Sequence, residues 1–170
     1  GRDMILKKLN SLNKILKKNV NKFSRNTMLS HTHGQPATPT TMGKEFLNFH
    51  HRINKLVHKL NEVAIEGKFN GATGNYSAHK VTFPNINWPI TNKKFINTLG
   101  IVENKYTTQI EPHDYICEMS NLLSHINSIL IGHSQDMWTY ISKNYFVQKN
   151  IIGEIGSSTM PHKINPINFE

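Results

Sequence analysis

The sequence predicts an all-α protein built as a bundle of long helices. Over three long stretches, apolar residues recur at steps of three and four, the spacing that places them on one face of a helix. Glycine and proline gather between these stretches, where the chain must turn. The 170 residues suffice for one domain with a core, although apolar residues make up only 37% of them.

The first two helices are predicted from their apolar stripes. The first stripe consists of Ile5, Leu9, Leu12, Leu16, Val20 and Phe23. A polar stretch with Gly34, Pro36 and Pro39 follows, and we expect a loop there. Thr40 or Thr41 could then cap a second helix. Its stripe consists of Phe46, Phe49, Ile53, Leu56, Leu60 and Val63 or Ala64, and Gly67 fits its C-terminal end.

The second half of the chain predicts a short helix and a long one. The short helix covers about residues 90–99 and is stopped by Gly100, and residues 101–110 have an extended character. Pro112 then begins a helix over residues 112–144. Apolar residues cover a wide arc of this helix, which indicates packing between several other helices, often in an oligomer.

The formal net charge is +9, with 20 Lys and Arg against 11 Asp and Glu. Nucleic-acid binding, attraction of a polyanionic small substrate, and solvated lysine-rich faces are three interpretations. We favour a mixture of the last two, because the basic residues are scattered and are not interleaved with aromatic residues in the manner of RNA-binding proteins. No apolar run is long enough to span a membrane.

The cysteine count and the two ends of the chain limit the alternatives further. Cys117 is the only cysteine, which excludes an intrachain disulfide and a cysteine-based zinc site. Its apolar surroundings in sequence predict a buried structural thiol. The chain opens within a helical pattern, without a signal-peptide core, and stops where Pro166 suggests that a helix begins. We therefore expect an excerpt of a longer intracellular protein.

Residues 156–165 form the stretch best suited to chemistry, with the sequence Gly-Ser-Ser-Thr-Met-Pro-His-Lys-Ile-Asn. Two hydroxyls, a cation and an amide follow two glycines, as in loops that close over an anion and exclude water. Ser157 is a candidate nucleophile or base, Lys163 a carboxylate or phosphate clamp, and Asn165 a neutral donor. A plain solvent-exposed loop is the alternative, and the spacing does not match a phosphate-binding P-loop.

Two further stretches carry polar groups in suggestive places. His31 and His33 could bind a metal or serve in acid–base catalysis, but no acidic third ligand lies nearby in sequence. Residues 107–114 precede a helix N-terminus, which favours anions, although helix capping explains part of this pattern. The histidines on predicted helices are interpreted as structural or surface residues: His50, His51, His58, His125 and His133.

Together these stretches resemble the superfamily of fumarase, aspartase, argininosuccinate lyase and adenylosuccinate lyase. Its signature, Gly-Ser-x-x-Met-x-x-Lys-x-Asn, is matched without a gap over residues 156–165. Residues 32–35 and 71–75 look like two other superfamily segments in the expected order. His162 before the lysine, with residues 33–45 and 108–114, resembles the adenylosuccinate lyase branch, particularly its bacterial type.

The resemblance implies a role for each matching residue. His33 matches the general acid that protonates the departing purine nitrogen, and Ser157 matches the general base that removes the Cβ proton of the succinyl group. Glu170 matches the carboxylate that orients this histidine. The implied substrate contacts are Thr32, Gln109, Ser158, Lys163 and Asn165.

The resemblance also implies a function and an assembly. The expected reaction is elimination of fumarate from adenylosuccinate to give AMP, and from the analogous succinylated imidazole carboxamide nucleotide, without metal or organic cofactor. Residues 1–170 would be part of one central helical domain, with the N- and C-terminal domains absent. A cytoplasmic homotetramer with active sites shared between subunits is expected, with neither nucleic acid nor membrane as a partner, and the segment alone should be inactive. Another superfamily lyase and a catalytically silent structural relative are the alternatives.

Overall fold

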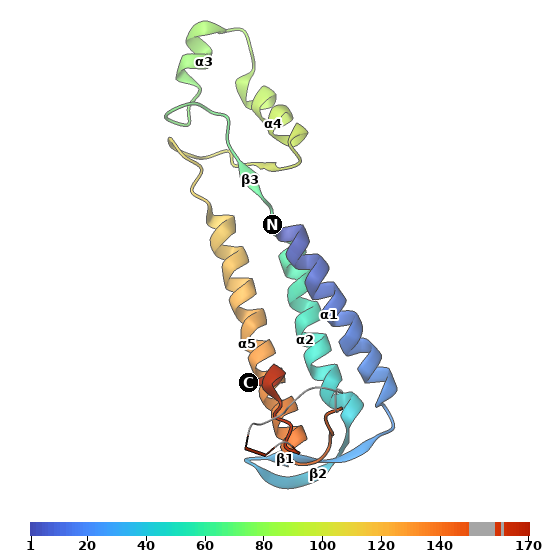
Figure 1. Ribbon diagram of the computed structural model, residues 1–170. Helices are drawn as coiled ribbons and strands as arrows, with labels where there is room; N and C mark the ends of the chain where they lie inside the picture. Colours follow the sequence, from blue (N-terminus) through green and yellow to red (C-terminus); the bar gives the residue numbers. More distant parts are fainter. Residues whose placement is uncertain (150–158, 161) are drawn as a thin grey trace. The chain divides into compact units, whose positions relative to one another are not determined.

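The computed structural model describes residues 1–149, 159–160 and 162–170. Three long helices dominate it: α1 (Arg2–Lys22), α2 (Met42–Glu62) and α5 (Asp114–Ser142). The other elements are the short helices α3 (Ser77–Thr82) and α4 (Trp88–Thr98), the 3-10 helix η1 (Ile167–Phe169), and the strands β1 (Thr27–Thr32), β2 (Gln35–Thr41), β3 (Glu66–Gly67) and β4 (Val102–Glu103) (Figure 1). The prediction of an all-α, long-helix architecture is confirmed.

The chain divides into two compact units. Unit 1 consists of Gly1–Leu6 and Val57–Leu123, and unit 2 of Lys7–Leu56 and Ser124–Glu170. Each long helix contributes residues to both units, because the boundaries fall within α1, α2 and α5. Among the described residues, no helix is long and apolar enough to cross a membrane.

The core of unit 2 is formed by the apolar stripes that the sequence predicts for the first two helices, together with residues of α5. Its buried apolar members are Leu9, Leu16, Met28, Met42, Phe46, Phe49, Ile53, Leu56, Ile126, Ile129 and Met137. The buried side chain of Asn13 is satisfied from α2: it donates to Asn54 at 2.9 Å and lies 2.9 Å from Nδ1 of His50. The helical period therefore places the core correctly, because burial of an apolar face drives the packing.

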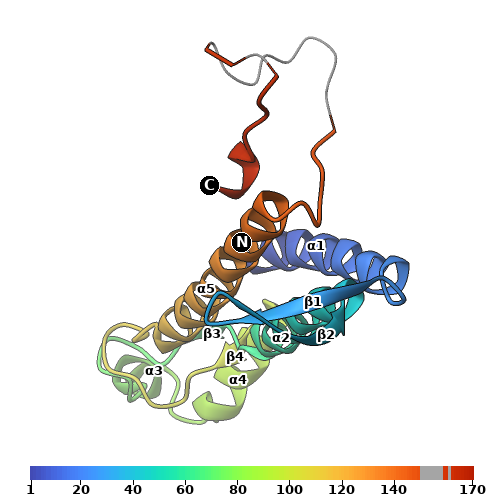
Figure 2. The ribbon, with the colours of Figure 1, turned by 90° about the horizontal axis from the view of Figure 1, so that it is seen from below.

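The stretch predicted as a loop between the first two helices is a β-hairpin, and that prediction was wrong. Strands β1 and β2 pair antiparallel and lead from the end of α1 to the start of α2 (Figure 2). The register pairs Thr27 with Thr41 and Thr32 with Gln35, with an irregularity between Leu29 and His31. The prolines of β2 are compatible with pairing because a two-stranded sheet leaves one edge of each strand free of ladder hydrogen bonds.

A glycine allows the close approach of α1 and α2 at the base of this hairpin. The amide of Gly43 donates to the carbonyl of Phe23 at 2.9 Å. A Cβ atom added to Gly43 would lie 2.7 Å from both the Cα of Ser24 and the carbonyl oxygen of Val20. The end of α1 therefore lies directly against the first turn of α2, which fixes where the hairpin leaves the bundle.

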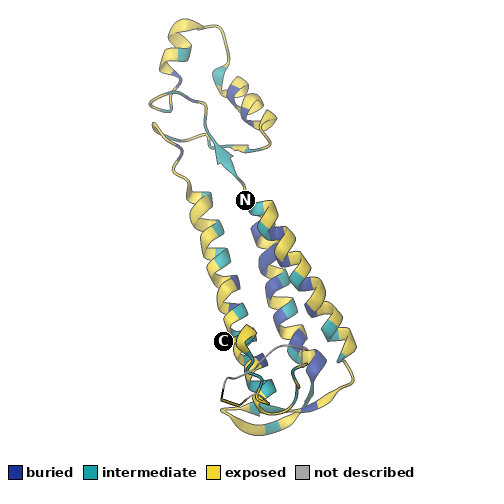
Figure 3. Cartoon of the chain, in the orientation of Figure 1, coloured by how far each residue is buried: buried dark blue, intermediate teal, exposed yellow. Residues whose placement is uncertain are grey.

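Helix α5 is confirmed within the predicted range, but much of its apolar arc is exposed in this chain (Figure 3). Only Ile126, Ile129 and Met137 are buried on it. Ile131 is 60% exposed and Trp138 is 43% exposed. Cys117 is exposed as well, so the prediction of a buried thiol was wrong. These side chains are exposed because the apolar arc of α5 is wider than the face that α1 and α2 can cover.

Unit 1 contains the short helices α3 and α4 and the short strands β3 and β4. Helix α4 confirms the predicted short helix, and the side chain of Asn87 caps it by accepting a hydrogen bond from the amide of Ile90 at 3.3 Å. Strands β3 and β4 pair in parallel over two residues each. Gly67 lies in β3, so the prediction that it ends the second helix was wrong: α2 ends at Glu62.

Candidate active site

The candidate general acid His33 stands at the tip of the hairpin in unit 2. His33 and Gly34 are the two residues between the paired Thr32 and Gln35, and both have positive φ angles, 53° and 73°. Two-residue hairpins of the common type I′ require positive φ at both positions, which glycine adopts freely and histidine more readily than most residues. The side chains of Thr32 and His33 are exposed. The turn therefore presents the imidazole to solvent on a short, well-defined connection.

The hairpin is tied to the segment that follows α5. The hydroxyl of Tyr145 donates to the carbonyl of Leu29 at 3.2 Å, and its ring lies 6.3 Å from the ring of His31 in an edge-on arrangement. Three residues further on, Nε2 of Gln148 donates to the carbonyl of Ile164 at 3.2 Å. The short segment 145–148 thus contacts both the hairpin and the C-terminal end of the signature stretch.

Lys163 and Asn165 lie in the described part of the signature stretch and differ in exposure. Lys163 is exposed, and its amide donates to the carbonyl of Met160 at 2.9 Å. Asn165 is half-buried. Ser157 and Ser158 lie outside the described residues, so their predicted roles as base and substrate contact stay predictions.

The predicted partnership between His33 and Glu170 also stays a prediction. Glu170 follows η1, is exposed, and its amide donates to the carbonyl of Ile167 at 3.3 Å. Within the part of the chain that the structure describes, no hydrogen bond or ion pair joins the side chains of His33, Lys163, Asn165 and Glu170. These four residues belong to unit 2.

The predicted substrate contact Gln109 belongs to unit 1, in a segment that is firmly fixed. Its carbonyl accepts a hydrogen bond from Nζ of Lys68 at 2.6 Å. Nearby, Asn70 is fully buried, and its Nδ2 donates to the hydroxyl of Thr107 at 2.8 Å. The side chain of Gln109 is exposed. Residues 68–70, which directly precede the superfamily-like segment 71–75, are therefore joined to residues 107–109 by direct hydrogen bonds.

Glu111, one of the two acidic residues of the 107–114 stretch, has a structural role. Glu111 is buried and accepts hydrogen bonds from Nδ2 of Asn104 at 2.9 Å and from the backbone amide of His113 at 2.7 Å. Its carboxylate also lies 2.8 Å from Nδ1 of His113. These contacts shape the turn that leads into α5, which supports the helix-entry interpretation for this residue.

The histidines on helices behave as predicted. His51, His58 and His125 are exposed, and His50 is half-buried against Asn13. His133 is half-buried, and burial lowers its pKa. None of the described histidines, cysteines and carboxylates forms a group of three or more that could hold a metal ion.

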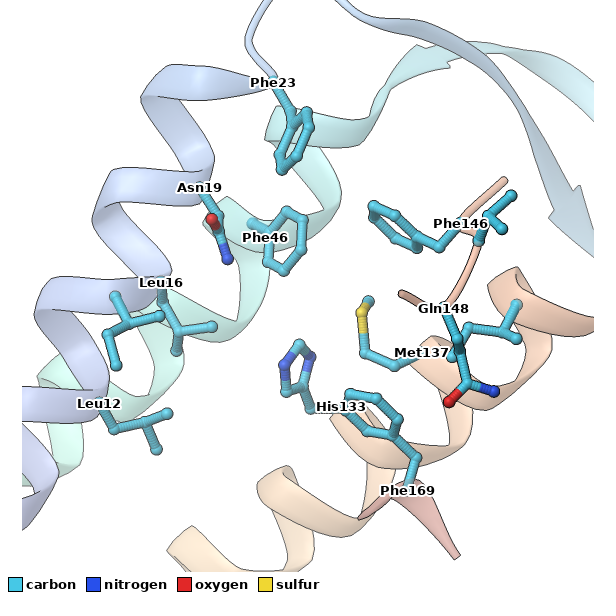
Figure 4. Close-up of a pocket in the computed structure, with 13 residues that line it drawn as sticks. Leu12, Leu16, Asn19, Phe23, Phe46, His133, Met137, Phe146, Gln148 and Phe169 are labelled. Atoms are coloured by element: carbon cyan, nitrogen blue, oxygen red, sulfur yellow. The ribbon is translucent and has the colours of Figure 1, made fainter. Parts of the chain in front are cut away.

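A cavity of about 470 Å³ in unit 2 is another candidate for a binding site, and it is predominantly apolar. In Figure 4 the side chains of His133 and Met137 on α5 point toward Phe46 on α2. The lining consists of Leu12, Ile15, Leu16, Asn19, Phe23, Phe46, His133, Met137, Ile141, Phe146, Val147, Gln148 and Phe169. This lining contains neither Lys nor Arg, so the cavity is ill suited to a polyanionic nucleotide.

Two contact residues were missed by sequence reasoning. Lys68 and Tyr145 make their site-related contacts with residues 41 and 116 positions away. No local pattern marks either residue, because both hydrogen bonds end on backbone carbonyls, which every residue carries.

Curated relatives resemble the chain closely. It is 59% identical over 148 residues to adenylosuccinate lyase of Buchnera aphidicola subsp. Schizaphis graminum, covering 87% of this chain and 32% of that protein. It is 54% identical over 143 residues to adenylosuccinate lyase of Escherichia coli strain K12, covering 84% of this chain and 31% of that protein. The chain therefore spans about a third of the length of the curated relatives it matches.

Solved structures with low sequence identity share the fold. The 3-carboxy-cis,cis-muconate lactonizing enzyme of Pseudomonas putida matches with a TM-score of 0.78 at 22% identity, over 99% of this chain and 37% of that one. A fumarate lyase of Mesorhizobium sp. BNC1 matches with a TM-score of 0.67 at 18% identity, over 84% of this chain and 33% of that one. A family model described as lyase matches residues 2–170.

Proposed function

Because this chain belongs to the lyase family of the fumarase and aspartase superfamily, we propose that the full protein eliminates fumarate from adenylosuccinate to give AMP. The observation that carries the proposal is the ungapped signature over residues 156–165 in a chain 59% identical to an adenylosuccinate lyase. The analogous succinylated imidazole carboxamide nucleotide is a second proposed substrate, since it offers the same succinyl-amine bond. The cytoplasm is the proposed location.

The proposed reaction is a general acid–base elimination. Ser157 removes a proton from Cβ of the succinyl group, the electron pair forms the double bond of fumarate, and the C–N bond to the purine breaks. His33 protonates the departing nitrogen, so atoms and charges balance without a cofactor. The hairpin tip suits His33 to this role because a two-residue turn holds an exposed imidazole in a defined place.

Two difficulties of this chemistry are met by the proposed substrate contacts. A proton beside a carboxylate is weakly acidic, so the carbanion-like state needs fixed positive charge and donors, which Lys163 and Asn165 would supply. A serine hydroxyl is a poor base until it is activated. The positive charge of Lys163, six residues after Ser157, would lower the cost of an alkoxide there.

The test is fumarate release by the full-length protein. Ser157→Ala should abolish turnover while leaving substrate binding largely intact, and His33→Gln should lower kcat by about two to four orders of magnitude. Ser11→Ala, on the exposed surface of α1, is the matched control and should keep wild-type activity. Unchanged turnover in Ser157→Ala would remove this residue from the mechanism.

The same assay separates the alternatives. Release of fumarate from argininosuccinate, with none from adenylosuccinate, would indicate a different superfamily lyase. No release from either substrate would favour a catalytically silent relative. Binding to random DNA that weakens with salt would support a nucleic-acid function instead.

We also propose that the full protein assembles as a homotetramer whose active sites are shared between subunits. The support is α5, on which large apolar side chains such as Ile116, Ile131 and Trp138 are 43–60% exposed in the isolated chain. An exposed apolar arc of this kind marks a surface for association. Light scattering of the full-length protein should give four subunits, and a monomer would contradict the proposal.

A further inference from the structure

The ammonium group of Lys68 joins two segments of unit 1 that lie far apart in sequence. Its Nζ donates to the carbonyl of Gly71 at 2.8 Å and to the carbonyl of Gln109 at 2.6 Å. Hydrogen bonds from a charged donor are about twice as strong as neutral ones. Within the described residues, no carboxylate lies within ion-pair distance of Lys68, so these carbonyls are its polar partners there.

Two other contacts hold the same pair of segments together, two residues before Gln109. The amide group of Asn70 and the hydroxyl of Thr107 exchange hydrogen bonds of 2.8 and 3.1 Å, with Asn70 fully buried. The backbone of Gly74 approaches so closely that an added Cβ would lie 1.8 Å from the carbonyl oxygen of Thr107. The backbone at Thr107 is therefore fixed independently of Lys68.

Two residues after Gln109, the buried Glu111 fixes the chain again by accepting hydrogen bonds from Asn104 and from the amide of His113. Between the fixed positions Thr107 and Glu111, the backbone of Gln109 itself is held by the hydrogen bond from Lys68. The amide group of Gln109 is exposed, and it makes no hydrogen bond with any residue that the structure describes. The arrangement is a fixed backbone that carries an unengaged side-chain amide.

We propose that Lys68 is a positioning residue that holds the backbone of Gln109, so that its side-chain amide is pre-organised for the nucleotide substrate. This inference rests on the proposed function, in which Gln109 contacts the substrate. Holding a binding group in its bound geometry before the ligand arrives removes an ordering cost from binding. Loss of Lys68 should therefore raise KM and leave kcat nearly unchanged.

The test is a double-mutant cycle in the full-length enzyme with adenylosuccinate as substrate. Lys68→Met should raise KM about tenfold, and the double variant with Gln109→Ala should bind no worse than Gln109→Ala alone, because coupled neighbours are not additive. Lys68→Arg, which keeps a charged donor, should recover most of the loss. Lys94→Met, which removes an exposed lysine of α4, is the matched control and should keep the wild-type KM.

Two kinetic outcomes would overturn the inference. If the effects of Lys68→Met and Gln109→Ala on KM multiply, Lys68 acts on the substrate or the fold by a separate route. If Gln109→Ala leaves KM unchanged, Lys68 has no binding group to position. Neither result touches the proposed function, which fails only if the wild-type protein releases no fumarate from adenylosuccinate.

A second measurement does not depend on turnover. Limited proteolysis of the ligand-free full-length protein should become faster at residues 108–111 in Lys68→Met and stay at the wild-type rate in Lys94→Met. Wild-type protection of this segment in a folded Lys68→Met protein would show that the anchors at Thr107 and Glu111 suffice, and the inference would be wrong.

Discussion

The hydroxyl of Tyr145 donates a 3.2 Å hydrogen bond to the carbonyl of Leu29, across 116 positions of sequence. Leu29 pairs with Pro39, directly before the irregularity in the ladder between β1 and β2. The tyrosine ring also lies 6.3 Å from the ring of His31 and 6.0 Å from that of Tyr140. The hairpin is thereby attached to the segment that follows α5.

Removing this hydroxyl should weaken the attachment and leave the aromatic contacts in place. In the full-length protein, Tyr145→Phe should lower the free energy of unfolding by about 1 kcal/mol, the usual net worth of one hydrogen bond. Tyr115→Phe is the control, since the Tyr115 hydroxyl makes no hydrogen bond within the described residues. Denaturant unfolding measures both, and equal stabilities of the two variants would contradict the role assigned to the Tyr145 hydroxyl.

The turn at His33 should tolerate asparagine better than alanine at the neighbouring position. A Cβ at Gly34 would meet nothing within 4 Å, so any penalty arises from its φ of +73°. Gly34→Ala should therefore cost about 1–2 kcal/mol of stability. Gly34→Asn should cost less, because asparagine adopts positive φ more readily. Equal unfolding free energies for the two variants would argue against a strained turn.

Alanine at two helical glycines should have opposite effects. Gly43→Ala should destabilise by about 1–3 kcal/mol, because its Cβ would lie 2.7 Å from backbone atoms of Val20 and Ser24. Gly132→Ala in α5 should stabilise by about 0.5–1 kcal/mol, since a Cβ there meets nothing within 4 Å and alanine favours helix. Thermal unfolding compares them, and a Gly43→Ala variant as stable as the wild-type protein would contradict the close approach of α1 and α2.

His133 should make the stability of the protein depend on pH. Its ring lies 4.7 Å from the ring of Phe49 and 6.0 Å from that of Phe46, and its buried Nδ1 has no hydrogen-bond partner among the described residues. Burial lowers its pKa below the ordinary value of 6.5. The unfolded chain therefore binds the proton more readily, so the stability is present above about pH 6.5 and falls as the pH drops toward the lowered pKa.

The variant His133→Phe should remove this component. The slope of unfolding free energy against pH should become smaller below about pH 6.5, relative to the wild-type protein. Burial raises the pKa of the neighbouring Asp136, which has the opposite effect on stability at acidic pH, so the difference between the two proteins is the quantity to compare. Met137→Leu changes the packing of the same cavity without removing a titrating group, and should keep the wild-type slope.

The helices could be predicted from the sequence because their formation depends on local periodicity. The stripe from Phe46 to Leu60 is buried as expected, and α4 ends at Thr98, just before Gly100. The hairpin could not be predicted from the same patterns. The prolines, the glycine and the histidines of residues 31–39 are typical of loops, and strand pairing depends on which partner a segment meets. Strand β3 was missed for the same reason, whereas β4 falls within residues 101–110, whose extended character was expected.

The candidate site divides along similar lines. The positions of His33 and Lys163 follow from motifs, which are local. The contacts of Lys68 and Tyr145 depend on the tertiary fold and end on backbone carbonyls, so no residue type marks their partners. The prediction that Cys117 is buried was wrong. Apolar neighbours in the sequence do not show whether other parts of the same chain cover that side of the helix.

The two-residue connection at His33 has a consequence for how the hairpin tolerates insertions. Side chains along a strand alternate between the two faces of the ribbon, so a shift of one residue in pairing sends every side chain to the opposite face. Thr32 is paired with Gln35, and a single extra residue between them would either enlarge the loop or slide β1 against β2. Either change would turn the imidazole away from its present direction while leaving the helices intact.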